Sequence, residues 1–287
     1  MEIKAYNHSM RKFDRKNFTS AVFDLDGTLL LDGLMTEGVA EAVEELRAAG
    51  IKTAINSGRD LSQISKELRD RFDYTIVANG AGVLDNRSGE YIFDSEFSFE
   101  LTSEVNDIVR AHGGNMFCFM KKFILCVESI MELMIKCLPL GEQRAFRLIP
   151  EFGDVNVELC TDIMTWFKEH KERPCKFYAL FPETEQWDQA ADELEKTGRL
   201  NVLRIRPGTL EIVPAGISKA AAIAKIDDPD KTVAFGDGTN DIEMLQASGF
   251  GVAMINGTDE VKAAADYIAP DVKEDGAATA IRDLFLN

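Results

Sequence analysis

At 287 residues, the chain is about twice the length of a typical domain, so we expect two compact units. Apolar residues make up 45% and charged residues 28%, with 8 prolines and 21 glycines, and this balance excludes a disordered or fibrous chain. The 49 acidic side chains outnumber the 32 basic ones, and because the net charge of −17 repels polyanions, we expect no nucleic-acid partner.

The cysteines and the apolar stretches favour a cytoplasmic location. The five cysteines contain no Cys-x-x-Cys pair, which disfavours a zinc site and a disulfide framework. Residues 1–20 are polar, with five Lys/Arg and no apolar run, so no signal peptide is predicted. Charged residues interrupt the longest apolar stretch, 116–140, and exclude a membrane span there.

From Ser20 onward, short apolar runs alternate with amphipathic helical stretches, a pattern typical of a parallel sheet covered by helices. The predicted elements of this part are strands at 21–25, 52–55 and 74–78 and helices at 36–49 and 60–71. A turn cluster at 85–89 then separates two short strand-like runs, and predicts a hairpin over 83–95 that leaves the parallel sheet.

A different pattern follows, in which neighbouring strands have little chain between them and must pair antiparallel. The predicted elements are helices at 99–112, 129–137, 161–171 and 184–197 and strands at 116–120, 123–127, 176–181 and 202–205. This part therefore reads as a separate α+β domain.

After Pro207-Gly208, the α/β pattern returns. The predicted elements are helices at 218–226, 241–247 and 277–286 and strands at 232–235 and 251–254. The simplest organisation is one core domain made from residues 1–82 and 208–287, with residues 83–207 inserted as a second domain.

Three strands of the predicted core end in small or acidic polar residues: Asp24-Leu-Asp-Gly-Thr28, Asn56-Ser-Gly-Arg59 and Gly236-Asp-Gly-Thr-Asn-Asp241. The first motif alone is equally compatible with a solvated turn. Because parallel strands bring their carboxyl ends to one edge of a sheet, three such endings favour a ligand site. The carboxylates that meet there would be those of Asp24, Asp26, Asp237 and Asp241. Their mutual repulsion requires a cation, and oxygen-only ligands predict Mg²⁺.

These motifs resemble those of haloacid dehalogenase superfamily phosphatases, of the Cof-type branch with the insert known as a class IIB cap. Between the second and last motifs lie a lysine motif, Gly216-Ile-Ser-Lys-Ala220, and two segments similar to signatures of the branch, Asn79-Gly-Ala81 and Leu210-Glu-Ile-Val-Pro214. The match covers both parts of the core, whereas the insert matches only in position, length and pattern. The resemblance implies a Rossmann-like parallel-sheet core with helices on both faces and an inserted α+β cap.

The resemblance also implies roles for individual residues. Asp24 would be the nucleophile that forms an aspartyl-phosphate, and Asp26 would act first as acid and then as base. Ser57 and the local backbone, including Gly58, would hold the phosphoryl oxygens, and Lys219 would neutralise their charge and restrain Asp24.

The implied cofactor is Mg²⁺, bound by Asp24, the backbone carbonyl of Asp26 and Asp237. Asp241 would lie beside the ion or one water away, and Asn240 would orient the group.

Each of these residues also has a simpler interpretation. Lys219 alone is more typical of a solvated helix residue, and Ser57 alone could cap the following helix. Arg59 is expected to be structural or to lie behind the contacting residues, and Asn79 to shape its loop. The segment Met116 to Cys137 is expected to form the core of the insert.

We therefore expect a Mg²⁺-dependent hydrolase of a small phosphomonoester, a sugar phosphate, whose partner is a small phosphorylated metabolite. A phosphotransferase similar to phosphomannomutase is the enzymatic alternative, but it needs a second phosphate site, and residues 83–205 hold 22 acids against 14 bases. A non-catalytic sugar-phosphate-binding regulator is the other alternative; a degraded motif would favour it, and no motif residue is replaced. The sequence does not select the ester or the oligomeric state.

Overall fold

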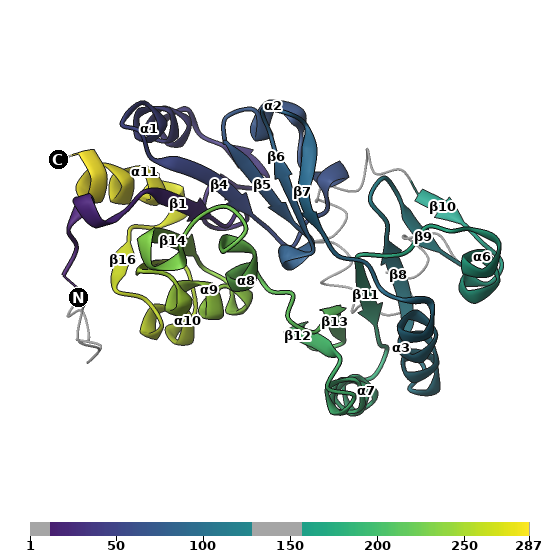
Figure 1. Cartoon of the computed structure of the whole chain (residues 1–287). Coiled ribbons are helices and arrows are strands. Elements are labelled where there is room, and N and C mark those ends of the chain that lie inside the picture. Colours follow the sequence, from purple (N-terminus) through teal and green to yellow (C-terminus); the bar gives the residue numbers. More distant parts are fainter. Residues whose placement is uncertain (1–11, 128–156, 287) are drawn as a thin grey trace.

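The computed structural model describes residues 12–127 and 157–286 of the chain. Two sheets, each with its own helices, lie side by side, and both described ends of the chain lie in the first unit (Figure 1). The helix expected at 129–137 lies outside the described residues.

The first unit contains an eight-stranded sheet in the order β16-β15-β14-β1-β4-β5-β6-β7. Strands β16 to β5 in this order are mutually parallel, and β6 and β7 are antiparallel to their neighbours. The strands are β1 (Ser20–Phe23), β4 (Lys52–Asn56), β5 (Tyr74–Val77), β6 (Gly82–Asp85), β7 (Glu90–Asp94), β14 (Thr232–Gly236), β15 (Phe250–Met254) and β16 (Tyr267–Ala269).

Helices cover both faces of this sheet because its central strands are apolar on both sides. Ala21 and Phe23 of β1 pack into one cluster with α1 and α11, whereas Val22 between them packs into another with α8, α9 and α10. The helices are α1 (Glu37–Ala48), α8 (Lys219–Ile223), α9 (Ile242–Ala247), α10 (Asp259–Ala263) and α11 (Gly276–Ile281). The predicted α/β class, with a parallel sheet between two helical layers, is confirmed.

The hairpin expected to leave the parallel sheet instead extends it, so that expectation was wrong. Strand β6 pairs antiparallel with β5 and β7 pairs with β6. Only the short turn η3 (Ala78–Gly80) separates β5 from β6, and positive φ angles of 55° at Asn79 and 99° at Gly80 reverse the chain there. A turn this short leaves no chain for a crossover, so β6 must lie beside β5.

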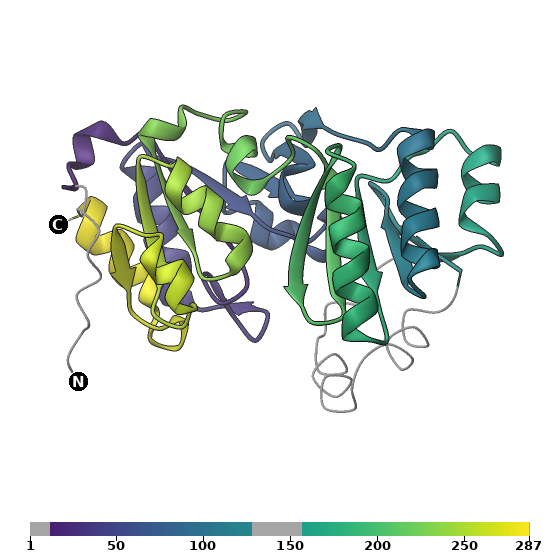
Figure 2. The same cartoon turned by 90° about the horizontal axis from the view of Figure 1, so that it is seen from below.

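The second unit contains a six-stranded sheet in the order β10-β9-β8-β11-β13-β12. Its strands are β8 (Asn115–Phe119), β9 (Ile124–Cys126), β10 (Val157–Leu159), β11 (Lys176–Leu180), β12 (Leu200–Arg206) and β13 (Thr209–Pro214). The helices α3 (Phe99–Ala111), α6 (Ile163–Glu169) and α7 (Thr184–Lys196) pack with one face of the sheet, and Figure 2 shows them on the same side. The expected antiparallel pairing of the neighbouring strands β8 and β9 is confirmed.

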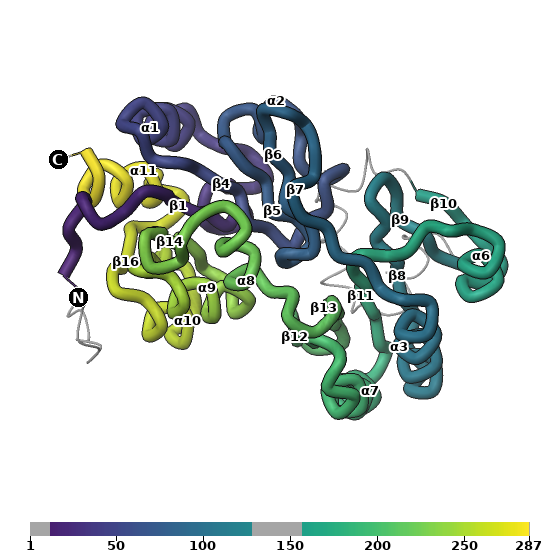
Figure 3. Tube along the Cα trace, viewed as in Figure 1, coloured from purple at the N-terminus to yellow at the C-terminus, as the bar shows by residue number. Residues whose placement is uncertain are grey.

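Strand β13 belongs to this second sheet, although we placed residues 208–214 in the core. Gly208, with a φ of 81°, turns the chain so that β13 pairs antiparallel with β12. Leu210 and Ile212 are buried in the same cluster as Phe177 of β11. The hairpin turn and these buried side chains together hold β13 in the second sheet. The chain therefore crosses between the two sheets after β7 and after β13 (Figure 3).

The helix expected at 60–71 is two short helices, η2 (Leu61–Gln63) and α2 (Lys66–Arg69). Asp60 caps the first by accepting from the Ser62 N–H, and Ser65 caps the second by accepting from the Leu68 N–H. Two cap residues within six positions start two helices instead of one.

The remaining elements are short. They are η1 (Arg15–Asn17), β2 (Leu30–Leu31), β3 (Leu34–Met35), η5 (Pro229–Lys231), η6 (Thr239–Asp241), η7 (Val272–Glu274) and the π-helical turn η8 (Arg282–Leu286). Within the described ranges, we find no helix with the length and apolar composition needed to cross a membrane.

Candidate active site

The three polar strand endings meet at one edge of the eight-stranded sheet. Strand β1 lies between β14 and β4 and is parallel to both, so Asp24, Ser57 and Asp237, which follow these strands, emerge on the same side. The Asp24 N–H donates to the carbonyl of Phe235 at 2.9 Å, which continues the β1–β14 pairing up to the site.

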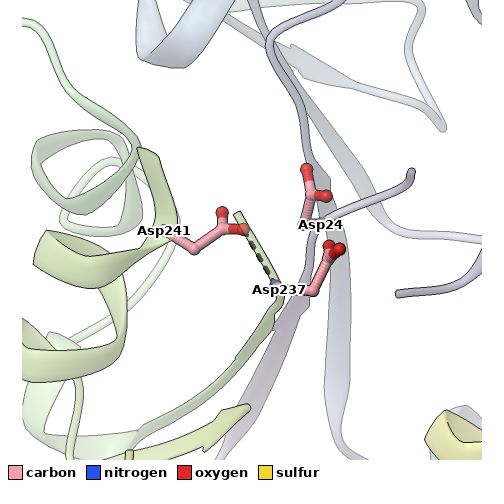
Figure 4. A group of neighbouring side chains, drawn as sticks. All are labelled: Asp24, Asp237 and Asp241. Carbon is pink, nitrogen blue, oxygen red and sulfur yellow. Dashed lines mark hydrogen bonds between the residues drawn. The ribbon is translucent and has the colours of Figure 1, made fainter. Parts of the chain in front are cut away.

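Asp24, Asp237 and Asp241 form a cluster in which one carboxylate oxygen of each lies within 4.8 Å of the others. Figure 4 shows the three side chains converging from β1 and from the turn after β14. Asp241 is fully buried, and its Oδ2 accepts from the backbone N–H groups of Asp237 at 3.1 Å and Gly238 at 2.9 Å. These bonds fix the turn that presents Asp237.

Lys219 lies inside this cluster, so the solvated-helix interpretation of this residue was wrong. Its side chain is 1% exposed, and its Nζ donates to Asp24 Oδ1 at 2.5 Å and to Asp241 Oδ1 at 2.7 Å. Burial opposes its positive charge, but Asp24 and Asp241 outweigh burial and raise the pKa of Lys219. Asn56 donates to the Lys219 carbonyl at 2.9 Å and ties the start of α8 to the end of β4.

The cluster carries more negative charge than Lys219 can balance. Burial raises the pKa of Asp24 well above its ordinary value, Lys219 opposes this effect, and Asp241 and Asp237 add to it. Burial, followed by the charge of Asp241, raises the pKa of Asp237 to about 6. Buried carboxylates that repel one another are a favourable oxygen donor set for a hard divalent cation, because the cation would reduce the repulsion.

Asp26 lies outside this cluster and is held by Arg59. The Arg59 Nε donates to Asp26 Oδ2 at 2.8 Å and its Nη2 donates to Oδ1 at 2.5 Å. The Asp26 side chain is 52% exposed, whereas the Arg59 side chain is 11% exposed. The two-pronged contact fixes the direction of the carboxylate. Arg59 thus supports Asp26, which agrees with the structural or supporting role expected of it.

Ser57 and Gly58 form the turn that follows β4. The Ser57 Oγ accepts from the Arg59 N–H at 3.2 Å, and Asp60, not Ser57, caps the next helix, so the interpretation of Ser57 as a cap was wrong. A side chain at position 58 would approach Asn79 Oδ1 to 3.1 Å, so glycine allows this close contact between the loops.

Gly27 is required by the geometry of the first motif. Its φ of 81° lies in the left-handed region, and a Cβ there would lie 2.2 Å from Asp237 Oδ2. The glycine thus brings the backbone of the first motif against the carboxylate of the last one.

Two residues that support Asp237 were missed as site residues. The Thr28 Oγ1 donates to Asp237 Oδ1 at 3.1 Å, and Asn256 donates to Asp237 Oδ2 at 3.3 Å and to the Gly27 carbonyl at 2.8 Å. Thr28 stands in the first motif, and Asn256 follows β15, so the argument from strand ends could have found both.

A buried polar chain links the second sheet to this site, and sequence reasoning missed two of its members. Lys176 of β11 donates to the Gly58 carbonyl at 2.5 Å and to Glu211 Oε1 of β13 at 2.7 Å. Asn79 donates to Glu211 Oε2, and Asn240 donates to Asn79 Oδ1 at 3.4 Å. Nothing in the local pattern of β11 marks Lys176, because its partners are more than 30 positions away. Glu211 stands in the segment Leu210–Pro214, which resembles a signature of the branch, and that signal could have found it.

A cavity of about 510 Å³ lies between the two sheets above these residues. Its volume is in the range of sites for small molecules. The strand endings supply one side of its lining, including Asp24, Asp26, Ser57, Gly58, Asp237 and Asn240. The six-stranded sheet supplies the other side, including Phe117, Lys176 and Tyr178, so a small molecule bound here would contact both units.

Comparison with known proteins relates the chain to one family. Residues 21–281 match the haloacid dehalogenase-like hydrolases. The 5-amino-6-(5-phospho-D-ribitylamino)uracil phosphatase YcsE of Bacillus subtilis is 28% identical over 273 residues, which cover 90% of this chain and 92% of that protein.

Solved structures are similar over nearly the whole chain. A haloacid dehalogenase-like hydrolase from Bacteroides thetaiotaomicron superposes with a TM-score of 0.75 at 26% identity and covers 93% of this chain and 100% of its own. The HAD subclass IIB sugar phosphatase BT4131 has the same fold, with a TM-score of 0.75 at 24% identity over 92% of this chain and 98% of its own. The family resemblance inferred from the motifs is confirmed, and the chain belongs to the haloacid dehalogenase-like hydrolases.

Proposed function

We propose that this protein is a Mg²⁺-dependent phosphatase that hydrolyses a small phosphomonoester of the sugar-phosphate kind through an aspartyl-phosphate intermediate. The observation that carries the proposal is the contact of buried Lys219 with Asp24, beside Asp237 and at the floor of a cavity. A lone carboxylate in this position would repel a phosphate ester, whereas one paired with an ammonium group can approach it.

In the first step, an Asp24 carboxylate oxygen attacks phosphorus, and the bond from phosphorus to the leaving oxygen breaks. Lys219 holds Asp24 in place through its 2.5 Å contact, favours the ionised form of Asp24 against the effect of burial, and would offer positive charge to the phosphoryl oxygens. Ser57 and the backbone at Gly58 would hold those oxygens.

Asp26 transfers the protons. It would protonate the leaving oxygen in the first step, and would take a proton from the water that attacks the aspartyl-phosphate in the second. Arg59 holds the Asp26 carboxylate at the cavity, away from the three-carboxylate cluster, as this role requires.

Asp24 and Asp237 would bind Mg²⁺ with the Asp26 carbonyl, and the ion would neutralise charge on the phosphoryl oxygens. Asp24 and Asp237 line the cavity, whereas Asp241 is fully buried outside its lining and is held by Lys219 and two backbone N–H groups. We therefore place Asp241 one water away from the ion. Asn240, which contacts Asn79, would orient the group.

Transfer to water is favoured over transfer to a second phosphorylated molecule. A phosphotransferase needs cations in the cap to hold another phosphate. The six-stranded sheet contributes two cations to the cavity lining: Lys176, which is paired with Glu211, and Arg206, which donates to the Tyr178 hydroxyl. A non-catalytic regulator would not need a nucleophile and an acid in one cavity with a buried lysine paired to the nucleophile.

The decisive experiment measures phosphate release from ribose 5-phosphate and glycerol phosphate, with Mg²⁺ and with a chelator. We expect turnover only with Mg²⁺, and a loss of about a thousandfold or more in Asp24→Asn. Asp32→Asn removes an exposed carboxylate from a nearby loop and is the matched control, which should keep full turnover. Full turnover by Asp24→Asn, or turnover indifferent to the chelator, would contradict the proposal.

A further inference from the structure

Lys176, the first residue of β11, reaches from the six-stranded sheet to the polar edge of the eight-stranded one. Side chains alternate along β11, so Phe177 packs toward the helices, whereas Lys176 and Tyr178 line the cavity. The Lys176 side chain is 2% exposed, and its Nζ donates to the Gly58 carbonyl at 2.5 Å and to Glu211 Oε1 at 2.7 Å. A buried ammonium group of one unit therefore contacts the backbone turn that follows β4 in the other.

Glu211 and Phe119 hold the ammonium group of Lys176 in this position. Glu211 faces the same side of the sheet, since its two neighbours in β13 pack toward the helices. The Phe119 ring, opposite Lys176 in the register, has its centre 4.3 Å from Nζ. With the Gly58 carbonyl, the Glu211 carboxylate and this ring, the ammonium group has as many partners as it has N–H donors.

The hydrogen bond from Lys176 fixes the peptide unit between Gly58 and Arg59. A peptide unit is planar, so the direction of its carbonyl also sets the direction of its N–H, which here belongs to Arg59. That N–H donates to the Ser57 Oγ at 3.2 Å. Because the Ser57 oxygen accepts this bond, its hydroxyl hydrogen can still be donated to a phosphoryl oxygen. The contact made by Lys176 thus reaches the Ser57 hydroxyl group through one peptide unit.

We infer that Lys176 is a positioning residue of the phosphate site, which acts through the 58–59 peptide unit on the hydroxyl group of Ser57. It is not a phosphate ligand itself, because its ammonium group is already held by Gly58, Glu211 and the Phe119 ring. The six-stranded sheet then completes the phosphate-binding turn of the other unit. This inference rests on the proposed function, because it places the phosphoryl group at Ser57.

Removal of the Lys176 ammonium group should weaken substrate binding more than it slows the turnover of bound substrate. Ser57 would hold the phosphoryl oxygens both in the bound ester and in the transition state, and loss of such a contact raises KM more than it lowers kcat. We expect KM for ribose 5-phosphate with Mg²⁺ to rise about tenfold in Lys176→Met, the effect of about one lost hydrogen bond.

A second variant separates this effect from a loss of stability. Lys176→Met combined with Glu211→Gln leaves neither charge unpaired, so it should be more stable than Lys176→Met, but it still has no donor for the Gly58 carbonyl. Its KM should therefore remain about tenfold above the parent value. Glu211→Gln alone keeps the donor and should raise KM less than the double variant. A KM that follows the free energy of unfolding across these three variants would overturn the inference.

Lys121→Met is the matched control. Lys121, in the turn between β8 and β9, also joins the two units, through ion pairs with Asp94 of β7 and with Glu96, but it lies outside the cavity lining. Loss of these ion pairs should leave KM at the parent value. A KM raised as much in Lys121→Met as in Lys176→Met would show that any contact between the units supports the site, and would overturn the role of the Gly58 contact.

A double-mutant cycle tests whether Lys176 acts through Ser57. In a Ser57→Ala protein there is no hydroxyl group to orient, so adding Lys176→Met and Glu211→Gln should raise KM less than about twofold. The full tenfold effect in this background would overturn the proposed path from Lys176 to Ser57.

Binding of inorganic phosphate keeps the inference separable from the proposed function. Phosphate is titrated with Mg²⁺ into the parent protein and into the variant Lys176→Met with Glu211→Gln, and the heat of binding is measured. A Kd about tenfold weaker in this variant supports the role of Lys176 even if no ester is hydrolysed, in which case the phosphatase proposal alone would fail. Equal Kd values, or no binding to the parent, would overturn the inference, and turnover of esters by the parent would still support the proposed function.

Discussion

Arg59 determines how Asp26 can act, because it holds both oxygens of that carboxylate. The pair lies at the cavity surface, where Asp26 can reach a leaving oxygen without joining the acidic cluster. In the proposed mechanism, separate placement of the two motif aspartates would let Asp24 attack phosphorus while Asp26 transfers protons.

This separation predicts that the loss of activity on replacing Asp26 depends on the leaving group of the substrate. Asp26→Asn should lower turnover of an alkyl phosphate by roughly a hundredfold or more, because the leaving alkoxide needs a proton. The leaving group of acetyl phosphate needs no proton. Asp26→Asn should therefore carry out the first step on acetyl phosphate almost as fast as the parent protein does. Rapid-mixing measurements on both substrates check this, and an equal loss on both would contradict the acid role.

The buried pair of Lys176 and Glu211 ties the two sheets together and supports the loop of Ser57 and Gly58. Their side chains are 2% and 11% exposed, so removing one partner leaves a buried charge without compensation. Lys176→Met should therefore lower the free energy of unfolding by about 3–5 kcal/mol.

A double variant distinguishes lost pairing from lost packing. Lys176→Met combined with Glu211→Gln removes both charges and leaves an amide oxygen that can accept from Asn79. The double variant should therefore recover a large part of the free energy of unfolding that Lys176→Met loses. Urea unfolding followed by fluorescence of Trp166 and Trp187, both in the second unit, measures it. A double variant as unstable as the single one would show that charge is not the cause.

At the scale of elements, caps decide where helices begin. Asp162 accepts from the Thr165 N–H at 2.7 Å at the start of α6, and this hydrogen bond lowers the pKa of Asp162. The stabilisation by a group with a lowered pKa is present above its unfolded value, near 3.8, and is lost as the pH falls through the folded value.

Asp162→Ala should cost about 1 kcal/mol of unfolding free energy at neutral pH, and Asp162→Asn less, because asparagine also caps. The difference in free energy of unfolding between the parent protein and Asp162→Ala should shrink once the pH falls below about 3.8. Denaturant unfolding at several pH values measures this, and a difference that grew on acidification would refute the role of the ionised cap.

At the scale of the molecule, the two ends of the chain converge on one charged site. Asp24 comes from the first strand and Asp237 from β14, more than 200 positions later, and they lie within the same cluster. Residues 1–82 carry a net charge of −2, residues 83–205 of −8 and residues 206–287 of −7, so the surplus of acid is spread over the chain. Only the cluster needs a cation to bring an anionic ester close.

Mg²⁺ should therefore stabilise the whole fold as well as promote turnover. At a concentration a hundred times its dissociation constant, the ion adds about 2.7 kcal/mol and should raise the midpoint of thermal unfolding by about 5 °C or more. Asp237→Asn should lose this shift, yet unfold no earlier than the parent in chelator, because one repelling charge is gone. Calorimetry at matched ionic strength checks both, and an equal shift in the variant would place the ion elsewhere.

The local pattern of the sequence determined the α/β core and the motifs at its strand ends. Apolar strands that alternate with amphipathic helices have few ways to pack, and parallel strands must present Asp24, Ser57 and Asp237 at one edge. Family motifs then indicated the chemistry, since each is a short run of neighbouring residues that a reader can recognise without the fold.

Tertiary structure alone decided which sheet receives β6, β7 and β13, and which side chains reach across the cavity. These depend on turns of two to four residues and on pairs such as Lys176–Glu211 and Arg59–Asp26, whose partners lie 35 and 33 positions apart. The side of the cavity that carries Phe117, Tyr178 and Ile205 depends on strand pairing and register, because β8 pairs with β11, and β11 with β13 of the β12–β13 hairpin, over long separations in sequence. A local pattern carries no information on such distant contacts, and so the motifs could indicate the family's chemistry, whereas the fold was needed to show which side chains line the cavity.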